Sequence, residues 1–169
     1  AVDIYDIALK ELFFSRDMFG IKPLYYWVSP GGSLCFASEI KQFTQLPDWK
    51  AKLNKERTCD YLLYNVTDHT DETMFTGVYH VLPGHCFKCN LNHFTAVPYG
   101  KIALTKWYDP KYTGSDISFA EAAETFEKLF RASVKKHLIA DVPVGAALSG
   151  GLDSSSVVCE IDNMLKNSH

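Results

Sequence analysis

The stretch that most constrains this chain lies near its carboxyl end, at residues 144–158. A run of small and apolar residues leads into Ser149-Gly150-Gly151, and an acid, three serines and an apolar-periodic segment follow. This order predicts a strand, a phosphate-binding loop and a helix. The two glycines permit a positive φ angle and let a ligand approach the backbone closely. Three polar residues are candidates to cap the following helix: Asp153, Ser154 and Ser155.

A loop of this kind suits a polyanion, because the free N–H groups and the dipole at a helix start attract negative charge. The carboxylate of Asp153 would repel a bare phosphate, and a divalent cation bridging the two removes that objection. Magnesium is the usual cation with nucleotides. The loop is not a Walker A motif, since that motif needs a lysine that this stretch does not contain. The alternative is a flexible Ser/Gly-rich turn, which the expected strand and helix on either side disfavour.

Residues 149–154, Ser-Gly-Gly-Leu-Asp-Ser, resemble the pyrophosphate loop of the ATP pyrophosphatase family. The longer run at residues 141–155 resembles glutamine-dependent asparagine synthetases, and this resemblance implies ATP and Mg²⁺ as cofactors. It also implies that the backbone of Leu148 meets the nucleotide and that Asp153 is the magnesium ligand. The implied pyrophosphate cradle consists of Ser149, Gly150, Gly151, Ser154 and Ser155.

The same resemblance implies a reaction and its substrates, which are aspartate, glutamine and ATP. The aspartate β-carboxylate attacks the α-phosphorus of ATP, giving β-aspartyl-AMP and pyrophosphate. Ammonia from glutamine, delivered through an internal tunnel, then displaces AMP. Magnesium and the cradle would stabilise the charge that builds on the leaving pyrophosphate.

The first forty residues predict an antiparallel meander followed by a short helix. Strands are expected at residues 2–7, 11–16, 24–28 and 33–37, with a helical stretch through Phe43. The adjacent Arg16 and Asp17 are interpreted as a charged pair that braces a turn. The pattern Arg-Asp-x-x-Gly-x-x-Pro-Leu-Tyr that begins there, followed by Ala-Ser-Glu, resembles the later part of class II glutamine amidotransferase domains. That resemblance implies a sandwich of antiparallel sheets with flanking helices.

Further along, the pattern predicts an amphipathic helix at residues 54–65 and a strand at residues 86–91, with residues 94–97 pairing back onto it. A capping box at Ser118 opens a helix that runs to residue 138, and its apolar stripe is interpreted as core packing.

The expected fold class is mixed α/β, in two parts. Residues 1–108 form the C-terminal part of an antiparallel β-sandwich amidotransferase domain. Residues 109–117 form a linker, and residues 118–169 start a parallel α/β nucleotide-binding synthetase domain.

Composition and charge exclude several classes of protein. A net charge of −3 without a basic stripe excludes a nucleic-acid footprint, and there is no long apolar run for a membrane span. The five scattered cysteines indicate reduced thiols and a cytoplasmic location. Cys86 and Cys89 form a lone C-x-x-C without a second pair of zinc ligands. His80 and His85 have no nucleophile or paired carboxylate beside them, so no catalytic role is assigned to either histidine.

Class II amidotransferases use an N-terminal cysteine whose own α-amino group is the base, and these residues contain no counterpart. No catalytic residue is therefore expected here, and the chain is interpreted as an inactive internal fragment of a protein that is a homodimer at full length. Two alternatives stay open. One keeps the architecture with another acceptor, as in β-lactam synthetases or the amide ligases of peptide and polysaccharide pathways. The other is a non-catalytic nucleotide-binding module.

Overall fold

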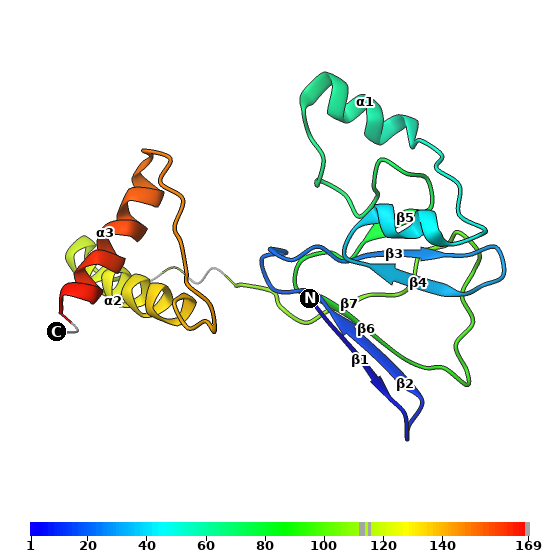
Figure 1. The fold of residues 1–169 in the computed structure, drawn as a ribbon, viewed down its shortest axis with the longest axis horizontal. Coiled ribbons are helices and arrows are strands. Elements are labelled where there is room, and N and C mark those ends of the chain that lie inside the picture. Colours follow the sequence, from blue (N-terminus) through cyan, green and yellow to red (C-terminus); the bar gives the residue numbers. More distant parts are fainter. Residues whose placement is uncertain (112–113, 115, 168–169) are drawn as a thin grey trace. The chain divides into compact units, whose positions relative to one another are not determined.

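The computed structural model describes residues 1–111, 114 and 116–167 (Figure 1). The chain divides into two compact units, Ala1–Lys111 and Tyr112–His169. Each unit has its own secondary structure, and each is treated by itself below. The expected linker at residues 109–117 lies partly outside the described residues.

Two antiparallel sheets form the first unit. The larger sheet has the strand order β1-β2-β6-β7, and the smaller has the order β4-β3-β5 (Figure 1). The larger sheet contains β1 (Val2–Asp6), β2 (Glu11–Ser15), β6 (His85–Asn90) and β7 (Thr105–Lys106). The smaller contains β3 (Tyr25–Val28), β4 (Leu34–Ala37) and β5 (Val78–His80). The expected meander of four strands is confirmed, and every strand pair in the described residues is antiparallel.

Strand β3 is buried on both faces, and this explains its continuous aromatic and apolar sequence. Successive side chains of a strand point to opposite faces. Tyr26 therefore packs into one cluster with Phe14 and Phe87 of the larger sheet, while Trp27 packs into a second cluster with Phe43. The first cluster joins the two sheets, and the second joins the smaller sheet to the short 3₁₀ helix η1 (Ile40–Gln45).

Helix α1 (Lys55–Tyr64) confirms the helix expected at residues 54–65. The side chain of Asn54 caps its start by accepting from two backbone N–H groups, and Asn65 ends it in the left-handed conformation, with a φ of 54°. No residue of α1 is buried. The helix is therefore held by its polar side chains rather than by an apolar face.

The described residues of the second unit contain two helices, α2 (Phe119–His137) and α3 (Leu152–Lys166). Helix α2 begins with the expected capping box, in which Ser118 and Glu121 bond each other's backbone N–H. The interpretation of its apolar stripe as core is wrong for these residues, because Val134 is the one buried residue of α2 and Phe126 is 68% exposed. Two helices alone do not supply a second layer that would cover the stripe.

Two expected strands are not formed. Residues 94–97 are irregular, because β6 is already paired with β2 on one edge and β7 on the other. Residues 143–149 are also irregular, so the strand predicted to lead into the phosphate loop is wrong for the described residues. A strand is held by hydrogen bonds to a neighbouring strand, and the described part of the second unit has none. The parallel sheet of a nucleotide-binding domain stays a prediction.

Candidate functional site

The Ser/Gly turn forms the entrance to helix α3. Leu148, Ser149 and Gly150 precede the helix, and Gly151 is its N-cap residue. Gly150 has a φ of +83°, a region that favours glycine, and a Cβ built there would meet no atom within 4 Å. The turn therefore has open space in front of its backbone, and all of its residues from Leu148 to Asp153 are exposed.

Among the described residues no side chain caps helix α3, which corrects the expectation that Asp153, Ser154 or Ser155 would do so. The hydroxyl of Ser154 points back to the turn, where it donates to the Gly151 carbonyl oxygen at 3.2 Å and accepts from the Ser149 N–H at 3.3 Å. Ser149 and Ser154 also share a hydroxyl–hydroxyl bond of 3.0 Å. The serines thus fix the shape of the turn and leave the first-turn amides of α3 without side-chain partners, as an anion site requires.

Asp153 lies in the first turn of α3, where a carboxylate is favoured by the helix dipole. Among residues 1–111, 114 and 116–167, no group of three or more His, Cys, Asp or Glu side chains is placed to hold a metal ion. Mg²⁺ bound with nucleotides commonly takes only one or two carboxylates, with phosphate oxygens and water completing its shell. A single exposed Asp153 beside an uncapped turn fits that arrangement.

In the first unit, Arg16 and Asp17 brace a turn as expected, but through backbone groups rather than through each other. The Asp17 carboxylate accepts from the N–H groups of residues 19, 21 and 22 at 3.1, 2.9 and 3.0 Å. These hydrogen bonds lower the pKa of Asp17 to about 2. The Arg16 guanidinium donates to the carbonyl oxygens of Gly20 and Lys22 within the turn and to that of Val81, which directly follows β5.

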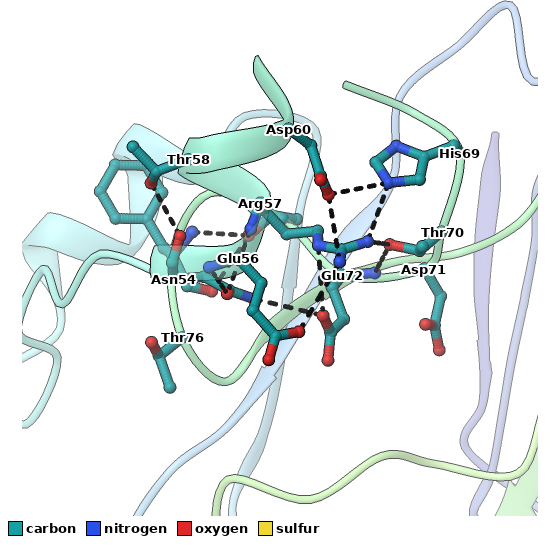
Figure 2. A network of polar contacts seen from close by, with 12 residues as sticks. Asn54, Glu56, Arg57, Thr58, Asp60, His69, Thr70, Asp71, Glu72 and Thr76 are labelled. Carbon is teal, nitrogen blue, oxygen red and sulfur yellow. Dashed lines mark hydrogen bonds and ion pairs between the residues drawn. The ribbon is translucent and has the colours of Figure 1, made fainter. Parts of the chain in front are cut away.

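A polar network around Arg57 holds helix α1 against the segment at residues 69–72 (Figure 2). The Arg57 guanidinium lies 3.1 Å from the carboxylate of Asp60, 3.6 Å from that of Glu72 and 2.9 Å from Nε2 of His69. The same His69 nitrogen lies 3.0 Å from Asp60. This network could not be predicted from the sequence, because its members are spread over the sixteen residues from Arg57 to Glu72 without a motif.

His80 and His85 make hydrogen bonds to backbone carbonyl oxygens. His80 is buried, donates from Nε2 to the Thr70 carbonyl oxygen and faces Arg16 with Nδ1 at 3.4 Å. His85 bonds the Pro83 carbonyl oxygen at 2.8 Å. All five cysteines are described and all are free thiols. None of the helices in the described part of the chain combines the length and the apolar composition of a membrane-spanning segment.

Comparison with known proteins finds a family match within each unit. Residues 1–100 match the family model of the glutamine amidotransferase domain, and residues 125–168 match that of asparagine synthase. Asparagine synthetase [glutamine-hydrolyzing] 3 of Bacillus subtilis is 29% identical over 93% of this chain and 24% of its own length. Amidase chry2 of Gibberella zeae is 34% identical over 96% of this chain and 23% of its own length.

A putative glutamine-hydrolyzing asparagine synthetase of Mycobacterium tuberculosis is 29% identical over 93% of this chain and 24% of its own length. The chain thus spans about a quarter of the length of these curated relatives. The amidotransferase match covers more than half of the chain, and the synthase match includes the whole Ser/Gly turn. The chain therefore belongs to the glutamine amidotransferase family, as part of a protein of the asparagine synthetase type.

Proposed function

We propose that the protein containing this chain is a glutamine-dependent asparagine synthetase, and that residues 148–155 bind the pyrophosphate part of ATP. The observation that carries the proposal is the uncapped helix start behind an exposed Ser/Gly turn, in one chain with an amidotransferase-family unit. Backbone amides at a helix start bind phosphate oxygens directly, and the absence of a side-chain cap keeps them available.

The proposed roles follow from the positions of the residues. The backbone of Leu148 borders the nucleotide. Gly150 and Gly151 let phosphate oxygens reach the amides of the turn, because neither glycine carries a side chain that would block them. Ser149 and Ser154 hold the turn in shape through their mutual hydrogen bond, and Ser155 lies one residue further along the helix. Asp153 would hold the magnesium ion that accompanies ATP. When bound, that ion would neutralise charge on the leaving pyrophosphate.

The relatives named amidases support a second candidate, in which the two-part architecture serves another acceptor than aspartate. Amidase chry2 of Gibberella zeae and amidase chyE of Penicillium rubens are 34% and 32% identical to this chain. The phosphate turn would act in the same way in either case, since it binds the nucleotide and not the acceptor. The two candidates differ in which carboxylic acid triggers release of pyrophosphate.

The test is pyrophosphate release by the full-length protein with ATP, Mg²⁺ and glutamine, with aspartate present or absent. Aspartate-dependent release together with asparagine formation supports the synthetase. Release that requires another carboxylic acid supports the second candidate.

Asp153→Ala should reduce turnover at least a hundredfold with either acceptor, because the charge on pyrophosphate then lacks its metal. The matched control is Asp162→Ala, which removes an exposed carboxylate of the same helix whose partner is Lys166. Undiminished turnover in Asp153→Ala would contradict the assignment of the site.

A further inference from the structure

The first unit contains a hollow of about 370 Å³ that none of the roles above uses. Its walls differ in chemistry. One wall is aromatic and consists of Trp27, Tyr79 and Tyr99, and the other carries the exposed lysines Lys50 and Lys52. The volume lies within the range of small-molecule sites, which begin at roughly 300 Å³.

The aromatic wall is held in a strained position. Tyr99 has a φ of 57°, the left-handed conformation that bulky residues rarely adopt. Its N–H donates to the Val28 carbonyl oxygen at 3.0 Å, and its ring centroid lies 6.4 Å from that of Trp27. The Tyr99 side chain packs beside Gly77, where a Cβ would lie in ordinary van der Waals contact with it at 3.6 Å. Half of Tyr99 stays exposed, so the hydrogen bond to Val28 and the packing on Trp27 hold an accessible aromatic surface in place against the backbone strain.

The other wall has unpaired positive charge. Neither Lys50 nor Lys52 makes a side-chain hydrogen bond or an ion pair with any described residue, whereas Lys101, whose ammonium lies over the Tyr79 ring, is paired with Asp71. The backbone of Lys52 is fixed beside the hollow, because its carbonyl oxygen accepts from the Thr76 N–H at 2.8 Å. Among the described residues that line the hollow, Asp48 is the one acid, so two lysines and one aspartate leave a net charge of about +1.

We propose that this hollow binds a small planar aromatic anion, meaning a ring system that carries a carboxylate or a phosphate group. The ligand ring packs against Tyr99, because Tyr79 already stacks on Tyr26 at 5.4 Å and has the Lys101 ammonium over its ring. The anionic group lies between the ammonium groups of Lys50 and Lys52. Both walls are needed, because a surface charge pair by itself contributes little and the exposed ring offers only modest apolar area. The proposal does not rest on the phosphate turn, which belongs to the other unit.

The test is a titration of the ¹⁵N-labelled 169-residue chain with 1-naphthyl phosphate, followed by NMR. The expected result is a set of saturable amide shifts centred on Gly77, Tyr99 and Thr76. Inorganic phosphate and 1-naphthol serve as the charge-only and ring-only probes, and each should bind at least fivefold more weakly. Shifts confined to residues 148–155 would assign the probe to the phosphate turn and overturn the proposal. Equal binding of either control probe would overturn it too.

Variants separate the two walls. Tyr99→Asn removes the ring and keeps a residue that tolerates the left-handed conformation, and it should weaken binding at least tenfold. The double variant Lys50→Gln with Lys52→Gln should weaken binding at least fivefold. The matched control is Lys22→Gln, an exposed lysine outside the lining, which should bind as the parent does. Unchanged affinity in both wall variants, with an unchanged spectrum elsewhere, would refute the site.

Discussion

Asp17 accepts three backbone hydrogen bonds in the turn that follows β2, so Asp17→Asn tests how much this carboxylate stabilises the amidotransferase unit. Asp17 accepts from three backbone N–H groups, and its pKa falls from an ordinary value of 3.8 to about 2. The amide of asparagine retains one acceptor oxygen and places an NH₂ group where the other oxygen was. We therefore expect the variant to lose the bond from the Lys22 N–H and the charge that strengthens the other two.

The magnitude follows from the pKa. The difference between 3.8 and about 2 corresponds to about 2.4 kcal/mol without screening. Because the carboxylate is partly exposed to solvent, we expect about 1 kcal/mol of lost stability at pH 7. Because the pKa is lowered in the folded state, this contribution to stability is fully present above pH 3.8 and is lost as the pH falls towards 2. The difference between the two proteins should therefore shrink to about half at pH 3.

The measurement is urea unfolding at pH 7, 5 and 3, followed by tryptophan fluorescence. All three tryptophans, Trp27, Trp49 and Trp107, lie within residues 1–111, so the signal reports on the first unit. Asp48→Asn is the control, since that exposed carboxylate has no side-chain hydrogen bond or ion pair with any described residue. A loss in Asp17→Asn that equals the control, or that does not change between pH 7 and pH 3, would refute the reasoning.

Three further predictions concern the core, a helix start and the phosphate turn. Phe14→Ala should cost about 3–5 kcal/mol in the same unfolding assay, because the ring is fully buried and stacks on Phe87 at 5.1 Å; a loss below 1 kcal/mol would contradict this. Ser118→Ala removes the cap of α2, including its bond to Glu121, and should cost about 1 kcal/mol, seen as a lower melting temperature of the far-UV circular dichroism signal. In Gly150→Ala the new side chain meets no steric obstacle, but the residue has to adopt a φ of +83°. We therefore expect this conformation of the turn to be destabilised by about 1–3 kcal/mol. Calorimetry of full-length protein with Mg²⁺-ATP should show this as weaker binding, and unchanged affinity would mean that the turn is not used.

The local sequence pattern was enough to predict the helices and strands that depend only on residues close together in the chain. The strands at β1 to β4 and the helices α1, α2 and α3 were predicted from alternation, turn residues and capping, which depend on neighbours a few residues away. The Ser/Gly turn was recognised for the same reason, since its glycines and serines are adjacent. Even there, the partner of the Ser154 hydroxyl was not predictable, because Asp153, Ser154 and Ser155 are all good caps by residue type.

Pairing between distant segments was decided only by the tertiary structure. Two segments compete to pair with the free edge of β6, namely residues 94–97 and β7. The local sequence pattern does not show which of the two pairs there. The Arg57 network and the hollow beside Tyr99 have the same origin, because each brings together side chains from separate segments that carry no motif. Sequence thus determined which local shapes form and to which family they belong, and three-dimensional packing determined which polar and aromatic groups meet.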